Sequence, residues 1–131
     1  MKDSDYGMRR ALPGTSYVDA VERVTAALKK EGFGILTSID VKATLKEKID
    51  VDFRPYVILG ACNPKLAHEA LSMDDNIGML LPCNVVVAET ADGAEVAIAR
   101  PKAMLGIAGA EGMGDFAAEV EARLGRALEQ L

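Results

Sequence analysis

Residues 56–71 read YVILGACNPKLAHEAL, a run in which an apolar strand pattern passes directly into a helix start. The continuous apolar stretch 56–62 predicts a strand that other elements cover on one or both faces. Asn63 and Pro64 then provide an N-cap side chain and a proline at the first helical position, so the residues after them should be helical. A strand end and a helix start are therefore expected to meet at Cys62, one of the chain's two cysteines.

The second cysteine lies in a similar local sequence. Residues 80–87 read LLPCNVVV, so Cys83, like Cys62, is followed by an asparagine. Cys62 ends one predicted strand and Cys83 begins the next. If these strands are antiparallel neighbours, both thiols lie at the same edge of the sheet, where directly opposed residues have Cα atoms about 4.5–5.5 Å apart. That separation overlaps the range that a disulfide permits.

The remaining elements follow from apolar spacing and turn residues. Ser16 and Asp19 have the spacing of a capping box, and apolar residues at helical intervals, beginning with Val18, predict a long helix that ends at Gly32. Strands are predicted near residues 33–39, 55–62, 83–89 and 94–99, a short charged helix at 41–48, and a final helix from about Asp115. Asp92 and Gly93 should supply the positive φ angles of the last hairpin turn. The pattern favours an α+β fold, with a mainly antiparallel sheet packed against two long helices.

Composition limits the classes of function. The 131 residues are 50% hydrophobic and 27% charged, which suits a single domain spanning residues 1–131. A net charge of −5 repels phosphate backbones and anionic lipid, so no nucleic-acid partner is expected. The first residues lack the apolar core of a signal peptide, and no apolar run reaches the ~20 residues of a membrane helix, which predicts a cytoplasmic protein without a membrane partner. In that compartment cysteines are more often reduced thiols, redox partners or metal ligands than structural disulfides.

Two long stretches carry a resemblance to a known family. GFGILTSIDVKATLKEKIDVDFRPYVILGACNPKLAHEAL, residues 32–71, and IGMLLPCNVVV, residues 77–87, resemble the family known as domain of unknown function 302, in the branch with the ACNP and LPCN signatures. The likeness extends from about Met8 to the C-terminus, which gives a domain core of about 8–131. It implies a β-α-β(4)-α domain with an extra helix, similar in topology to half of the TATA-binding-protein fold, and a homodimer. No reaction is established for the family, so the resemblance implies no catalytic residue.

Two interpretations of the thiols stay open. Cys62 precedes a helix start, where the helix dipole and free N–H groups favour a thiolate with nucleophilic or metal-binding character. Cysteine is equally a common core residue, and Leu59, Ala61 and the leucines before Cys83 provide apolar surroundings. The rate of labelling by a thiol reagent separates reactive from inert thiols.

Other side chains are candidates for the same site. Asn63 and Asn84 are expected either to satisfy backbone groups or to line, with the thiols, a small polar mouth above the strands. Asp40 could add a carboxylate from a neighbouring turn, although it also suits the cap of the short charged helix. His68, the single histidine, could complete a soft-metal site, for example for zinc, with the two cysteines, but its helical position directs it towards solvent.

No motif identifies an enzyme. Residues 106–114, GIAGAEGMG, precede a helix as a phosphate-binding loop would, but they lack the ending of a P-loop and the spacing of the dinucleotide fingerprint, so a linker is expected. His68 has no recognisable nucleophile in a strained turn nearby, which disfavours a hydrolase. Two hypotheses remain. One is a thiol-based binding or redox protein that uses Cys62 and Cys83 for a small ligand or soft metal; the other is a non-catalytic homodimeric interaction module with buried, inert cysteines.

Overall fold

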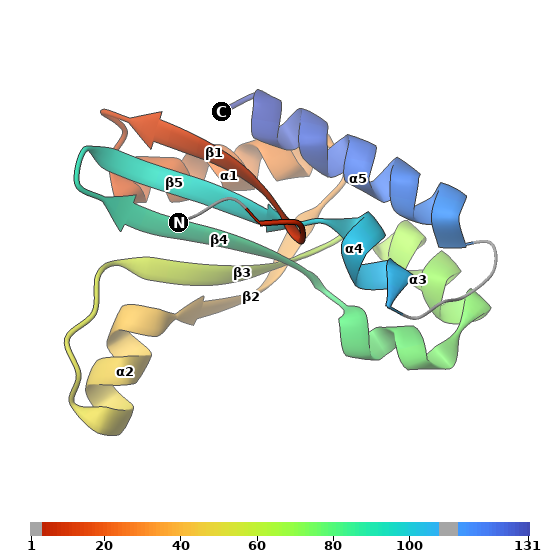
Figure 1. The fold of residues 1–131 in the computed structure, drawn as a ribbon, viewed down its shortest axis with the longest axis horizontal. Helices are drawn as coiled ribbons and strands as arrows, with labels where there is room; N and C mark the ends of the chain where they lie inside the picture. Colours follow the sequence, from red (N-terminus) through yellow and green to blue (C-terminus); the bar gives the residue numbers. More distant parts are fainter. Residues whose placement is uncertain (1–3, 108–112) are drawn as a thin grey trace.

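The computed structural model of the chain describes residues 4–107 and 113–131. Its elements run in the order β1 (Gly7–Pro13), α1 (Tyr17–Lys30), β2 (Gly34–Asp40), α2 (Val41–Ile49), β3 (Tyr56–Cys62), α3 (Pro64–Met73), the 3-10 helix η1 (Asp75–Leu80), β4 (Cys83–Thr90), β5 (Gly93–Ala99), α4 (Pro101–Gly106) and α5 (Met113–Glu129). None of the helices in the described ranges is long and apolar enough to cross a membrane. The predicted α+β class is confirmed (Figure 1).

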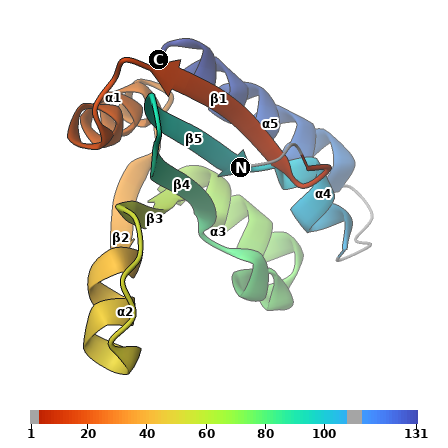
Figure 2. The same ribbon diagram turned by 60° about the vertical axis from the view of Figure 1, so that its left-hand side comes forward.

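The strands form one antiparallel sheet in the order β1-β5-β4-β3-β2. The two longest helices, α1 and α5, pack together over one face of this sheet, and the described helices leave most of the other face, the open face, uncovered (Figures 1 and 2). Ala88 and its partner Glu95 on that other face are buried. Alternate strand residues are buried against the two helices because successive side chains of a strand point to opposite faces. These core residues include Leu12, Val57, Leu59, Val85, Val87, Val96 and Ile98.

Local capping signals define α1 as predicted. The Ser16 hydroxyl oxygen accepts a hydrogen bond from the Asp19 backbone N–H at 3.1 Å, and Gly32 follows the helix with a φ of +88°. One residue of the predicted apolar stripe is placed wrongly, because Val18 is exposed while Val24 and Leu28 are buried. The helix therefore turns a narrower face to the sheet than the apolar spacing indicates.

β1 is a strand that the residue pattern does not reveal. Its sequence, GMRRALP, has adjacent arginines and no simple apolar alternation. It forms because it pairs with β5 from Gly7 opposite Ala99 to Pro13 opposite Gly93. Arg10 also donates hydrogen bonds to the last carbonyls of α5, at 3.0 Å to Leu128 and 2.6 Å to Glu129. Long-range pairing thus overrides a weak local preference.

The β4–β5 hairpin is tight, but its predicted backbone chemistry is wrong. Thr90 pairs with Gly93, so Ala91 and Asp92 form the two-residue loop. Neither Asp92 nor Gly93 has a positive φ, an angle that among the described residues occurs at Gly14, Gly32 and Asp50. Gly93 serves close approach instead, since a Cβ there would lie 2.4 Å from the Leu12 carbonyl oxygen and 2.8 Å from the Gly14 nitrogen.

The glycine-spaced segment 106–114 falls mainly on residues 108–112, which lie outside the described residues. Its described ends belong to helices, because Gly106 ends α4 and Met113 begins α5. α4 is a further element that the residue pattern did not indicate.

α2 forms an arm that projects from the end of β2 (Figure 2). Its cap is the predicted one, since the Asp40 carboxylate accepts a hydrogen bond from the Ala43 N–H at 2.9 Å. All nine residues of α2 are described, and none of them is buried. The arm is therefore held by its cap and its attachment to β2 and β3 rather than by a core of its own.

Candidate functional site

β3 and β4 bring both cysteines to one end of the sheet, as predicted. Cys62 is the last residue of β3 and Cys83 the first residue of β4, and both are free thiols. The expected direct opposition is wrong by one residue, because Ala61 is the partner of Cys83. Cys62 lies one position further on, where it pairs with Gly34 of β2.

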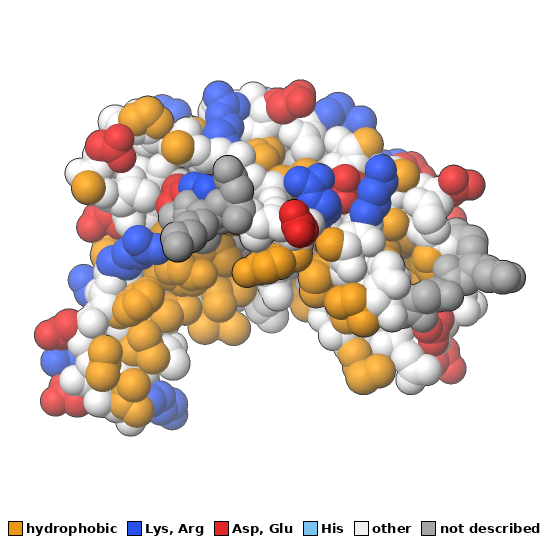
Figure 3. Space-filling model, in the orientation of Figure 1, with side chains coloured by type: hydrophobic (Ala, Val, Ile, Leu, Met, Phe, Trp, Pro, Cys, Tyr) orange, Lys and Arg blue, Asp and Glu red, His pale blue; other side chains and the backbone are white. Residues whose placement is uncertain are grey.

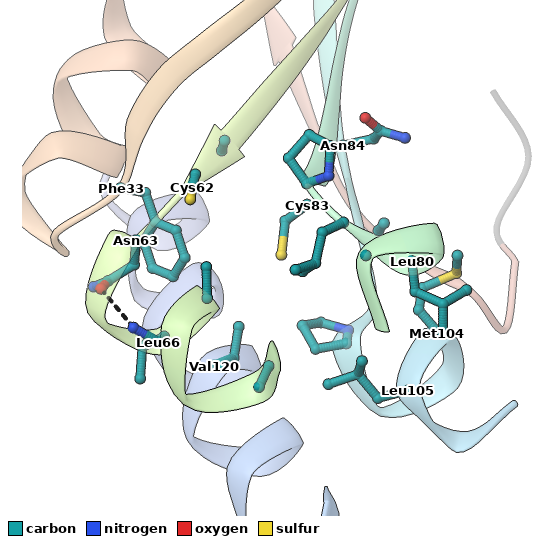
Figure 4. A pocket seen from close by; sticks show the side chains of 18 of the residues that line it. Phe33, Cys62, Asn63, Leu66, Leu80, Cys83, Asn84, Met104, Leu105 and Val120 are labelled. Atoms are coloured by element: carbon teal, nitrogen blue, oxygen red, sulfur yellow. Dashed lines mark hydrogen bonds between the residues drawn. The ribbon is translucent and has the colours of Figure 1, made fainter. Parts of the chain in front are cut away.

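A cavity of about 460 Å³ lies at this end of the sheet, and both cysteines line it. Figure 4 shows the two sulfur atoms on the cavity side of their strands. α3 forms one wall, η1 and α4 form the facing wall, and α5 contributes to the inner end. Its buried lining residues are Phe33, Ala61, Leu66, Ala70, Pro101, Leu105, Phe116 and Val120. Among the lining residues that the structure describes, none carries a charge.

Asn63 builds the wall beside Cys62. Its side-chain oxygen accepts a hydrogen bond from the Leu66 N–H at 3.1 Å, which confirms the predicted helix cap (Figure 4). Its amide nitrogen packs against Gly32, where an added Cβ would stand 2.7 Å away. The Asn63 amide therefore has a structural role, although Asn63 also lines the cavity.

The other polar candidates lie further from the sulfur atoms. Asn84 lines the outer part of the cavity, but its side chain is exposed and points away from both thiols (Figure 4). Both predicted asparagines thus line the same cavity as the two cysteines, although the Asn84 amide is directed away from the sulfur atoms. Asp40 caps α2 at the far end of β2 from Gly34, the partner of Cys62, and does not line the cavity.

His68 is exposed on α3, as its helical position predicts, and is not part of the cavity lining. Within residues 4–107 and 113–131, no group of three or more His, Cys, Asp or Glu side chains lies together in a way that could hold a metal ion. Cys62, Cys83 and His68 therefore do not assemble a three-ligand site within one described chain.

The environment of the thiols disfavours their ionised form. Burial raises the pKa of Cys62, and burial together with the nearby Cys62 raises the pKa of Cys83 from 9.0 to about 11. Burial therefore opposes the thiolate that the start of α3 is expected to favour at Cys62. At neutral pH both groups are protonated thiols, small and polarizable, with only weak hydrogen-bonding capacity.

One wall of the cavity comes from elements that the sequence pattern did not locate. Leu80 of η1, Met104 and Leu105 of α4 face α3 across the cavity (Figure 4). The available signals were the apolar residues just before Pro82 and those just after Pro101. Neither stretch is long enough to predict a helix by periodicity.

Comparison with known proteins agrees with this fold. The family model Domain of unknown function DUF302 matches residues 8–131, as the resemblance implied. The crystal structure of an uncharacterized conserved protein DUF302 from Bacillus stearothermophilus is 30% identical in sequence, with a TM-score of 0.88 over 97% of this chain and 98% of that chain. No curated protein matches the chain.

Proposed function

The chain belongs to the family Domain of unknown function DUF302, and from its cavity we propose that it binds a small, uncharged, mainly apolar molecule that contacts Cys62 and Cys83. One observation carries the proposal: a cavity of about 460 Å³ has both thiols on its wall and no charge among its described lining residues. Small-molecule sites typically have volumes of ~300–1,000 Å³ and a mainly apolar lining with few polar groups.

The absence of charge from the described lining argues for an uncharged ligand. A charged group that entered the cavity would lose its hydration without gaining an ionic partner from those residues. The protonated thiols add polarizable surface to the aliphatic walls. The same environment weakens the soft-metal and redox forms of the proposal, because metal binding and thiol exchange both need the thiolate.

A neutral fluorescent probe, N-phenyl-1-naphthylamine, tests the proposal. Ala67 lines the cavity on α3, so Ala67→Phe should fill part of it and weaken probe binding by about tenfold or more, equivalent to ~1.4 kcal/mol. Ala26→Phe, at an exposed position of α1, is the matched control and should bind like the unchanged protein. Absence of probe binding, or equal binding by both folded variants, would contradict the proposal.

A homodimeric interaction module is the second candidate, favoured by the exposed apolar residues of β2 and the arm. Figure 3 shows hydrophobic side chains gathered in the hollow between the arm and the rest of the molecule. The exposed members on β2, α2 and the segment after α2 are Leu36, Ile39, Ile49, Val51 and Phe53. Such surfaces mark interaction sites. Light scattering at micromolar concentration should give a dimer mass if this surface joins two copies, and a monomer mass would exclude it.

A further inference from the structure

The cavity opens towards the uncovered face of the sheet. Two of its lining residues, Leu36 of β2 and Met79 of η1, are 65% and 80% exposed. Thr37 and Asn84 also line it and are exposed. Thr37 and Asn84 both pair with Gly60 of β3, so Thr37, Gly60 and Asn84 form one row across β2, β3 and β4. The mouth of the cavity therefore lies at the border of the open face of the sheet.

An apolar row continues from this mouth. Ile39, Ile58, Val86 and Ala97 are consecutive partners across four strands and are named here the open-face row. Ile39, Ile58 and Val86 each lie two residues from the row at the mouth, which places them on the same face of the sheet. Ile39 is exposed and the other three are partly exposed. Figure 3 shows hydrophobic side chains gathered in the hollow between the arm and the rest of the molecule. The row at the mouth, formed by Thr37, Gly60 and Asn84, therefore lies between the cavity and the open-face row.

Aliphatic side chains outnumber the two phenylalanines of the cavity lining, which favours a flexible aliphatic ligand. Leucine, alanine and methionine side chains make up most of the walls, and Met79 and Met104 can adapt to ligands of different length. Two phenylalanines, Phe33 and Phe116, also line the cavity, whereas the edge-to-face aromatic pair of the described residues, Phe53 with Tyr56, lies outside it. Ring ligands gain most from aromatic partners in offset or edge-to-face contact.

We infer that the ligand of the proposed binding site is an extended aliphatic chain. Its end occupies the cavity beside Cys62 and Cys83, and its continuation lies on the open-face row. This inference rests on the proposed function and specifies the class of molecule. The part of the ligand that is bound is a hydrocarbon chain, and any polar group of the ligand lies beyond the open-face row.

Displacement of N-phenyl-1-naphthylamine by straight-chain alcohols tests the inference. From 1-hexanol through 1-octanol and 1-decanol to 1-dodecanol, affinity should rise about fourfold per methylene, which is the conversion of ~0.8 kcal/mol per buried CH₂. The compact alcohol 1-adamantanol, with as many carbons as 1-decanol, should bind about tenfold or more weakly than 1-decanol, a difference of ~1.4 kcal/mol.

Variants locate the chain on the row. Ile58→Thr should abolish the gain from 1-octanol to 1-dodecanol and leave 1-hexanol binding unchanged, and Val86→Thr is a second variant with the same expectation. Val18→Thr, at an exposed position of α1, is the control and should keep the full chain-length dependence.

The outcomes separate the two proposals. If the probe binds but 1-adamantanol binds as tightly as 1-decanol, the aliphatic-chain inference is overturned and the cavity proposal stands. The same conclusion follows if affinity stops rising at 1-octanol in the unchanged protein while light scattering gives a dimer, because a second copy then covers the row. If neither the probe nor any alcohol binds, the proposed function itself fails.

Discussion

Ala61 lies directly opposite Cys83 in the β3–β4 ladder, so Cys62 stands one residue beyond the last pair of that ladder. The two thiols therefore line one cavity from positions that are offset by one residue along neighbouring strands. They also differ in how deeply they are buried. Cys83 has the larger rise in pKa, since its thiolate would be formed in a more desolvated place and near Cys62. This asymmetry can be measured.

Cys83 should react more slowly than Cys62 with a chromogenic disulfide reagent. The thiolate is the reacting form, and each unit of pKa changes its fraction about tenfold at a pH below both pKa values. The Cys62→Ser variant, which keeps Cys83, should be labelled more slowly at mildly alkaline pH than Cys83→Ser, which keeps Cys62, and both should react faster in urea. Equal rates in the folded state would contradict the assigned environments.

Stability should fall in alkaline solution partly because of Cys83. Its pKa is raised from 9.0 in the absence of burial to about 11 in the fold. Between these values the unfolded chain loses the thiol proton while the folded chain keeps it, so the free energy of unfolding falls as pH rises. The contribution of this pKa shift to the free energy of unfolding is roughly 1–3 kcal/mol. It is fully present below about pH 9 and is lost as the pH rises through about 11.

Urea unfolding under reducing conditions checks this slope. Lysine and tyrosine groups also titrate in alkaline solution, so the informative quantity is the difference between the unchanged protein and Cys83→Ala. The variant should be less stable at neutral pH, because the side chain that fills this wall is shortened. The gap should narrow between pH 9 and pH 11. A constant gap would show that the pKa of Cys83 does not change on folding.

The confirmed expectations are those that depend on neighbours in sequence. The caps by Ser16, Asp40 and Asn63 each involve a backbone N–H three residues away, so the local pattern is sufficient to predict them. The strands of the sheet centre were found for a similar reason, because their apolar residues are continuous over β3 and β4.

The missed features depend on contacts between distant parts of the chain. α4 is tied to α5 through Glu121, which accepts hydrogen bonds from the Arg100 side chain at 3.3 Å and from the Lys102 N–H at 3.2 Å. The offset between Cys62 and Cys83 is also non-local, since apolar patterning specifies which face a residue occupies but not its partner on the next strand.

Two helix caps with the same local geometry should have different effects on stability. Asn63→Ala should lower the free energy of unfolding by about 1 kcal/mol, whereas Asp40→Ala should lower it by a few tenths at most. The reason is that α3 buries Leu66 and Ala70, while the described residues of α2 include no buried one. The arm can therefore unravel without disturbing the core.

Urea denaturation of both variants compares the caps, and Asn63→Asp serves as the control that keeps the acceptor oxygen. Hydrogen exchange should show faster exchange of α2 amides in Asp40→Ala, with the β3 amides unchanged. Equal losses of stability from the two alanine substitutions would mean that α2 contributes to the cooperative core after all.

Gly60 should not tolerate even an alanine. A Cβ at this position would lie 2.2 Å from the Thr37 hydroxyl oxygen and 2.8 Å from Cγ of Pro82, both closer than real contacts allow. Gly60→Ala should therefore force β2 or the start of β4 to move and lower the free energy of unfolding by about 1–3 kcal/mol. Gly34→Ala, on the neighbouring strand, meets nothing within 4 Å and should change it by less than ~0.5 kcal/mol.

A double-mutant cycle with Thr37→Ala identifies the cause of this intolerance. Removing the Thr37 hydroxyl deletes the shorter contact but leaves Pro82 in place, so Thr37→Ala should restore part, and not all, of the stability lost in Gly60→Ala. The coupling energy from urea unfolding of the four proteins should be about 0.5–3 kcal/mol. Because Thr37 and Pro82 both line the cavity, the Gly60→Ala protein should also bind N-phenyl-1-naphthylamine more weakly, with binding partly recovered in the double variant. Additive losses without coupling would show that the strand rejects alanine for a reason other than these two contacts.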